Sequence, residues 1–168
     1  MTHSPEIDSI IENAIHYSKE RKHQYVTVEH LLLSLVTHTS FKKCLVNFGA
    51  DVESMSQEIS AYLDSLHAIV SKDDEVVPRK TNSLERVMNR SVTQVLFSGR
   101  RQVTTIDLYL SIASEGNSHA HYFLLKYGIN KQEFVAFWQK NYKHDDIGNL
   151  TENQADEILE EYTINLTQ

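Results

Sequence analysis

The chain has 168 residues, of which 40% are hydrophobic, with only five glycines and two prolines; this is enough apolar material for a packed core and too little turn chemistry for a β-rich fold. The single cysteine, Cys44, excludes an internal disulfide and a cysteine-built zinc site, and its apolar neighbours predict a buried thiol. The whole net charge of −7 lies in residues 144–168, which carry seven acids and no lysine or arginine. The remaining chain is formally neutral and lacks the basic surface that nucleic-acid binding requires.

The first residues, 1–9, are polar and acidic and do not contain the apolar segment of a signal peptide. No apolar stretch approaches the roughly 20 residues that a membrane span requires. We therefore expect a soluble, cytoplasmic protein that binds neither membranes nor nucleic acids.

Four helices are predicted in the first half of the chain. Apolar residues recur at the spacing i, i+3, i+4, i+7 of one helix face over about 5–22. The next helix should begin after Thr27, whose hydroxyl can accept an unpaired backbone N–H. Two more helices are expected over about 39–48 and 51–66, with Gly49 between them, because glycine readily adopts the left-handed conformation at a helix end.

A charged segment containing a proline, 71–82, follows and is predicted to be an exposed connector. The second half then repeats the pattern. Thr104 should start a helix, and Asp107, three residues later, resembles the second half of a capping box. Gly128 is expected to follow the end of the next helix. The other helices of this half are predicted over about 83–98, 117–127 and 130–142.

The two halves are copies of one unit. Residues 26–35 align with residues 103–112 at an offset of 77, and an offset of 79 later aligns Gly49 with Gly128. We therefore predict an all-α fold in which two tandem four-helix repeats form an eight-helix domain with an approximate twofold axis. Its buried residues should include Ile10, Ile11, Leu32, Leu35, Leu45, Val87, Val92, Leu108, Ile112, Leu124 and Phe134.

The composition of the chain changes near residue 142. Residues 1–142 contain both repeats and form the predicted domain. Residues 143–168 are acidic and have few apolar anchors, so we predict a flexible linker there.

Three segments carry a resemblance to a known family: residues 23–33, which read His-Gln-Tyr-Val-Thr-Val-Glu-His-Leu-Leu-Leu, and residues 98–104 and 118–128. The duplicated unit resembles the Clp N-terminal repeat, and its second copy is most similar to the ClpA branch. The end of the chain, 159–168, is similar to the stretch where the first ATPase module begins in ClpA. The resemblance implies a fragment of a longer unfoldase, which assembles as a hexamer and feeds a ClpP peptidase.

In such unfoldases the N-terminal domain receives protein substrates directly or through a ClpS-type adaptor, so the resemblance implies a docking domain that is monomeric when isolated. The chain has no glycine-rich phosphate loop and no recognisable nucleophile–base pair. We therefore predict that it is not an enzyme and holds no cofactor, with ATP bound only in the missing ATPase modules.

The nine histidines invite a test for metal binding. His16 and His23 are seven residues apart and could share a helix face, with Glu20 as a further oxygen ligand. Incidental zinc at His23 is therefore one interpretation, and a solvated histidine is the other.

Glu29 allows two interpretations. In the first turn of a helix, its carboxylate complements the helix dipole. The resemblance suggests the alternative of a partner contact, since in the ClpC branch a glutamate at this position of each unit helps bind phosphoarginine. The second copy here is Ile106, which cannot pair with a guanidinium, so a phosphoarginine reader of the ClpC type is the secondary hypothesis.

Arg86 and Arg90 are four residues apart on the predicted helix 83–98, opposite its apolar positions, so both should point outward. They are either a solubilising face or part of a binding surface. The resemblance implies the second role, because the matching ClpA positions lie where the adaptor docks. We therefore predict one exposed polar patch, whose members are His23, Gln24, Glu29, Thr81, Arg86 and Arg90.

Overall fold

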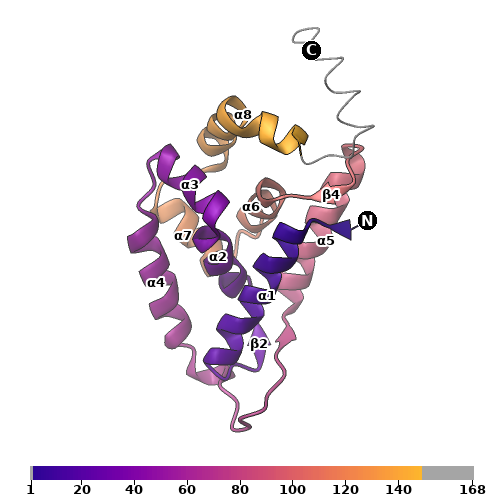
Figure 1. Ribbon diagram of the computed structural model, residues 1–168. Helices are drawn as coiled ribbons and strands as arrows, with labels where there is room; N and C mark the ends of the chain where they lie inside the picture. The colour runs from indigo at the N-terminus through magenta and orange to yellow at the C-terminus, as the bar shows by residue number, and fades with distance from the viewer. Residues whose placement is uncertain (1, 149–168) are drawn as a thin grey trace, which may run out of the picture.

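The computed structural model describes residues 2–148, and within them the chain forms eight α-helices in two groups of four (Figure 1). The helices of the first repeat are α1 (Pro5–Glu20), α2 (Val28–Thr37), α3 (Thr39–Phe48) and α4 (Val52–Asp64). The helices of the second repeat are α5 (Asn82–Phe97), α6 (Thr105–Ala113), α7 (His119–Lys126) and α8 (Lys131–Gly148). A short 3-10 helix, η1 (His67–Ile69), precedes the connector. The all-α prediction and the tandem arrangement are confirmed.

Two small parallel sheets, which no sequence pattern indicated, join the repeats. They are built from β1 (Thr2–His3), β2 (Tyr25–Val26), β3 (Arg79–Lys80) and β4 (Gln102–Val103). In β1–β4, Thr2 pairs with Gln102, and in β2–β3, Tyr25 pairs with Arg79. The offset of 77 residues carries Thr2 onto Arg79 and Tyr25 onto Gln102, so the repeat relates one pairing to the other. Each repeat thus lends one strand to each sheet, as an approximate twofold axis requires.

Helix starts follow the predicted capping chemistry. Thr27 and Thr104 cap α2 and α6, and each is part of a capping box, with His30 and Asp107 as the respective third residues. At the end of α3, Gly49 has φ of 104°, the left-handed conformation that was expected there. Local sequence therefore sets where these helices begin and end.

The core is formed largely by α2 and α6 and the faces of the helices around them. Of the eleven residues that were predicted to be buried, nine lie in the buried core. The other two, Ile11 and Val92, are only partly buried. They lie on α1 and α5, where both line an open groove while packing against the core, so they are less buried than the other nine.

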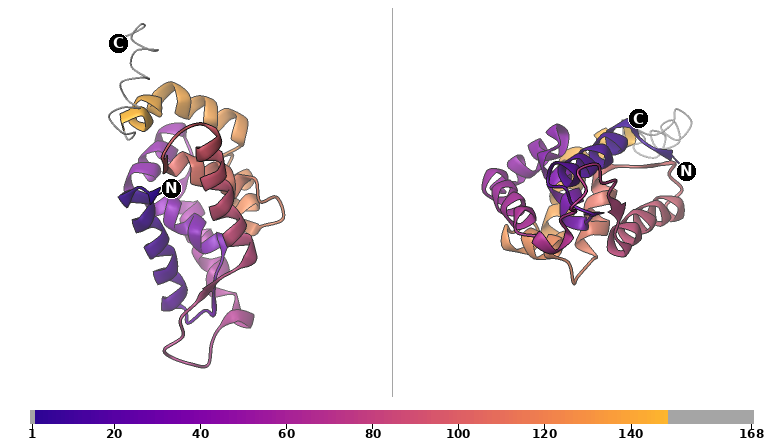
Figure 2. Two further views of the ribbon diagram at one scale, coloured as in Figure 1. Left: turned by 90° about the vertical axis from the view of Figure 1, so that its right-hand side faces the viewer. Right: turned by 90° about the horizontal axis from the view of Figure 1, so that it is seen from below.

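Helix α8 lies across one end of the bundle in both side views (Figures 1 and 2). Its Phe134 packs edge to face against Phe41, Phe48 and Tyr109, so a single ring joins the two repeats. The helix continues to Gly148, past the predicted end at residue 142, because no glycine or proline interrupts the chain between Gly128 and Gly148.

The remainder of the predicted acidic linker, 149–168, lies outside the described residues. The division of the chain at residue 142 therefore stays a prediction. Among the helices described, none is long and apolar enough to span a bilayer.

Candidate docking surface

Two of the predicted contact residues meet at the small sheet formed by β2 and β3. The Gln24 carbonyl accepts the Arg79 N–H at 2.9 Å, and the Thr81 N–H donates to the Val26 carbonyl at 3.1 Å. Thr81 also caps α5, since its hydroxyl accepts the Leu84 N–H at 3.1 Å. Gln24 is exposed and Thr81 is partly buried. The backbone pairing of β2 with β3 therefore places Gln24 near Thr81, as the predicted patch requires.

A surface hollow of ≈ 410 Å³ lies here, and it is lined by Tyr25, Arg79, Lys80, Thr81 and Asn82. The guanidinium of Arg79 lies 5.7 Å from the centre of the Tyr25 ring. The hollow is open and polar, which suits contact with another surface better than enclosure of a small ligand.

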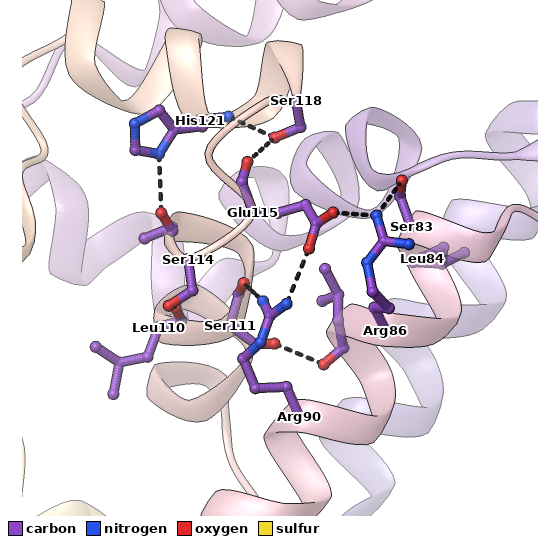
Figure 3. A network of polar contacts seen from close by, with 12 residues as sticks. Ser83, Leu84, Arg86, Arg90, Leu110, Ser111, Ser114, Glu115, Ser118 and His121 are labelled. Atoms are coloured by element: carbon purple, nitrogen blue, oxygen red, sulfur yellow. Dashed lines mark hydrogen bonds and ion pairs between the residues drawn. The ribbon is translucent and has the colours of Figure 1, made fainter.

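Arg86 and Arg90 lie on the next turns of α5, and both bind Glu115, which follows the end of α6 (Figure 3). Arg86 Nη2 donates to Glu115 Oε2 at 2.6 Å, and Arg90 Nη2 donates to Glu115 Oε1 at 2.9 Å. The hydrogen bond from Arg86, assisted by Arg90, lowers the pKa of Glu115 against the opposing effect of its burial. The carboxylate therefore remains charged and holds both arginines.

The two arginines differ in exposure. The Arg86 side chain is 57% exposed, as predicted. Arg90 is only 29% exposed, and its Nη1 also donates to the Ser111 carbonyl at 2.7 Å. The prediction that both point outward was therefore wrong for Arg90, because carbonyl and carboxylate acceptors at the end of α6 draw its guanidinium inward.

Glu115 continues this network into α7 (Figure 3). The Ser118 hydroxyl donates to the Glu115 carbonyl at 2.7 Å and accepts the His121 N–H at 3.0 Å, which caps α7. The His121 ring in turn bonds the Ala113 carbonyl at 2.8 Å. The loop between α6 and α7 is thus tied both to α5 and to α7.

Glu29 was predicted to be exposed, and that prediction was wrong. Glu29 is only 7% exposed, and its Oε2 accepts the Ala120 N–H at 2.9 Å. Ala120 lies in the first turn of α7, where backbone N–H groups have no partner within the helix. Glu29 therefore fastens α2 of the first repeat to α7 of the second, and it is Glu115, not Glu29, that pairs with Arg86.

His23 was placed at the edge of the exposed patch, and it is instead 1% exposed. Its Nδ1 lies 2.9 Å from Nε2 of His30, which is fully buried. His16 cannot share a helix face with His23, because α1 ends at Glu20. In the described part of the chain no cluster of three or more His, Cys, Asp and Glu side chains could hold a metal. The described residues therefore provide no set of ligands for zinc at His23.

The surface that remains consists of Gln24, Thr81, Arg86 and Arg90. Glu115, which positions the arginines, was not among the predicted site residues. One signal was available: Glu115 is the only acid between Asp107 and Glu133.

A second surface lies between the first helices of the two repeats, α1 and α5. It is a groove of ≈ 390 Å³ with an apolar floor and a charged rim. Its residues are Asp8, Ile11, Lys80, Glu85, Met88, Asn89 and Val92. On α5 the apolar side continues one turn further to Leu96, which is 58% exposed.

Structural comparison places this arrangement among known folds. The Hsp104 N-terminal domain from Candida albicans has a TM-score of 0.69 at 13% identity, over 83% of this chain and 90% of that chain. A chain from a malarial protein secretion system has a TM-score of 0.71 at 10% identity, over 84% and 98% of the two chains. A chain from a study of the ATPase ClpV in type VI secretion has a TM-score of 0.59 at 18% identity, over 90% and 91%. At these identities the likeness concerns the fold alone.

Sequence comparison gives the family. A ClpA homolog protein from Fuscovulum blasticum is 30% identical over 140 residues, which are 79% of this chain and 17% of that protein. The chain thus corresponds to a small part of that relative's length. The family model described as the Clp repeat (R) N-terminal domain matches residues 2–127. The chain belongs to the Clp repeat N-terminal domain family.

Proposed function

We propose that this chain is the adaptor- and substrate-docking domain of a ClpA-type unfoldase. In this proposal the chain has no catalytic role, works in the cytoplasm as part of a hexamer with ClpP, and binds a ClpS-type adaptor. The observation that carries the proposal is the anchoring of Arg86 and Arg90 by Glu115.

Anchoring prepares the exposed arginine for a partner. The Arg86 guanidinium is held by Glu115 and by the Ser83 hydroxyl at 3.0 Å, yet more than half of the side chain faces solvent. A partner that offers a carboxylate or carbonyl oxygen therefore meets a donor whose side chain is already ordered, which reduces the entropic cost of binding. Thr81 caps α5 and Gln24 is hydrogen-bonded to Arg79 just before it, so in this proposal both extend the polar contact from the start of the helix that carries Arg86.

Titration of the chain with a ClpS-type adaptor, followed by calorimetry, tests the proposal. Arg86→Ala should weaken adaptor binding by about tenfold, which corresponds to about 1.4 kcal/mol, while folding is retained because the side chain is largely exposed. Lys140→Ala, which removes one exposed charge from α8, is the matched control and should bind as the parent does. Failure of the parent to bind, or equal affinity of Arg86→Ala and the parent, would contradict the proposal.

Direct substrate capture is the second candidate, and the groove between α1 and α5 favours it. Half-buried Ile11, Met88 and Val92 could cover apolar side chains of an unfolded segment, and exposed Glu85 and Lys80 at the rim could pair with charged residues of either sign beside them. Val92→Asp should then weaken binding of a fluorescent unfolded peptide of this composition and leave adaptor binding unchanged. The opposite pattern would contradict capture in this groove.

Phosphoarginine recognition of the ClpC type receives less support. Glu29 is already committed to the Ala120 N–H, and its second copy is the buried Ile106. Neither repeat therefore offers a free carboxylate at this position for a ligand guanidinium.

A further inference from the structure

The pair His23–His30 occupies the place that an ion pair holds in the second repeat. The offset of 77 carries His23 onto Arg100 and His30 onto Asp107. Arg100 binds Asp107 through its two terminal guanidinium nitrogens, Nη1 and Nη2, and Asp107 Oδ2 accepts the Thr104 N–H at 2.8 Å. In the first repeat, His30 Nδ1 accepts the Thr27 N–H at 2.9 Å and its Nε2 meets His23 at 2.9 Å. Both pairs tie the turn after the first helix to the start of the second helix.

The hydrogen bonds fix the protonation of the two rings. The Thr27 N–H can only donate, so His30 Nδ1 must carry a lone pair and the ring proton must lie on Nε2. His30 Nε2–H then donates to His23 Nδ1, which must also be unprotonated. Both rings are therefore neutral, and a proton added to either Nδ1 would face a donor. Each protonation breaks one bond of the network.

We propose that the His23–His30 pair is a proton-sensitive latch, which holds the start of α2 when neutral and releases it when either ring is protonated. The second repeat has no such sensitivity at the equivalent place, because a guanidinium–carboxylate pair contains no imidazole, the side chain that ordinarily titrates between pH 5 and 8.

The surroundings of the pair disfavour protonation, because they lower the pKa of both imidazoles. Burial lowers the pKa of His30 to about 3, with further lowering from His23 and Arg21. Burial and then Arg21 lower the pKa of His23, while Asp64 on α4 opposes them. Arg21 and Asp64 form an ion pair of 2.8 Å with each other, so the acid does not compensate a second positive charge at the rings.

Of the other titratable groups near this turn, Lys22 pairs with Asp74 of the connector at 2.6 Å, whereas Glu29 and Tyr62 face the second repeat. Glu29, on α2 itself, gives its carboxylate to the Ala120 N–H. Tyr62 on α4 bonds His119 on α7 at 3.0 Å, and burial followed by the charge of Glu29 raises the pKa of Tyr62. Release of the first turn of α2 would therefore loosen Glu29 from α7, so the latch links the state of one buried histidine to the contact between repeats.

Hydrogen exchange of the 168-residue chain at pH 7.5 and pH 5.0 tests the latch. An opened turn with ordinary imidazole pKa values near 6.5 binds protons that the closed turn excludes. Acidification from pH 7.5 to pH 5.0 should therefore raise the opening equilibrium by about 30-fold for His30 alone, and His23 should raise it further. After correction for intrinsic exchange, protection of the hydrogen-bonded N–H groups of Thr27, His30, Leu31 and Ala120 should fall by at least this factor. The N–H groups of Thr104 and Leu108 at the start of α6 should change little. Equal changes in α2 and α6 would overturn the proposal.

The matched variant is His23→Arg/His30→Asp, which transfers the ion pair of the second repeat into the first. It should remove the pH dependence of protection in α2, and persistence of that dependence would overturn the proposal. If the variant does not fold, the NMR chemical shifts of the imidazole nitrogens in the parent test the proposal. Nδ1 of His23 and of His30 should remain unprotonated at pH 5.0. The exposed His16 serves as the reference. Titration of His23 and His30 together with His16 would overturn the latch as well.

Discussion

Each repeat contains an equivalent hydrogen bond between its first and second helices. In the first, the Ser34 hydroxyl donates to the Ile10 carbonyl at 2.6 Å, and in the second, the Ser111 hydroxyl donates to the Val87 carbonyl at 2.6 Å. Both residues of each bond are related by the offset of 77. The bond joins the first helix of a unit to its second, so this contact defines how the unit packs.

The repeats differ where they meet each other and at the turn before the second helix. Glu29 reaches α7, whereas its counterpart Ile106 is apolar and 5% exposed. A neutral histidine pair in the first repeat corresponds to an ion pair in the second. The backbone plan is thus common to both units, while the polar chemistry at their edges is specific to each.

Removal of the Phe134 ring, which joins the two repeats, should have the largest effect. Phe134 is fully buried and contacts aromatic rings of both repeats, so Phe134→Ala should cost about 3–5 kcal/mol of unfolding free energy. The counterpart at the offset of 79 is Met55, which is also fully buried but has no such ring contacts among those described. Met55→Ala should cost less in urea unfolding. A larger cost for Met55→Ala would contradict this asymmetry.

Acid should destabilise the first repeat through His30. Its folded pKa of about 3 lies below the ordinary 6.5, so the unfolded chain binds the proton first and stability falls as pH drops below 6.5, levelling off near the folded pKa. Between pH 7.5 and pH 5.0 the loss from this group should be about 2 kcal/mol. Urea titrations at the two pH values measure it, with His16→Gln as control because that imidazole is 65% exposed. An unchanged midpoint would contradict the prediction.

Neutralising Glu29 should have a smaller effect. Glu29→Gln keeps an oxygen acceptor for the Ala120 N–H and removes the charge that complements the start of α7, so the cost should be about 0.5–1 kcal/mol. The Ala120 amide resonance should move with it. Glu53→Gln, at an exposed acid in the first turn of α4, is the control and should leave that resonance in place.

Most of the fold could be predicted from the sequence because helix periodicity, capping residues and the internal repeat all act locally. Thr27, Thr104 and Gly49 lie where their chemistry requires. The short strands could not be predicted, since two residues such as Tyr25 and Val26 give no periodic pattern.

The candidate site was harder to predict, because exposure depends on which helix end lies nearby. The first-turn position of Glu29 was recognised, but the partner of its carboxylate is an N–H of α7, 91 residues away in the chain. Glu115 was missed because it lies in a loop between helices, where no periodicity relates it to Arg86 or Arg90. His23 follows the end of α1, so helix spacing could not place it beside His30.

The smallest expected difference concerns the bond that the repeats share. Ser34→Ala and Ser111→Ala each remove a buried hydroxyl whose acceptor is a helix carbonyl, and each should cost about 1 kcal/mol. Since both serines are at most 1% exposed and both bonds have the same length, the two costs should agree within about 0.5 kcal/mol. The double variant should then lose the sum of the two. Urea unfolding of the three variants measures this, and a large difference between the single variants would mean that the surroundings of the bond, rather than the bond itself, determine its contribution.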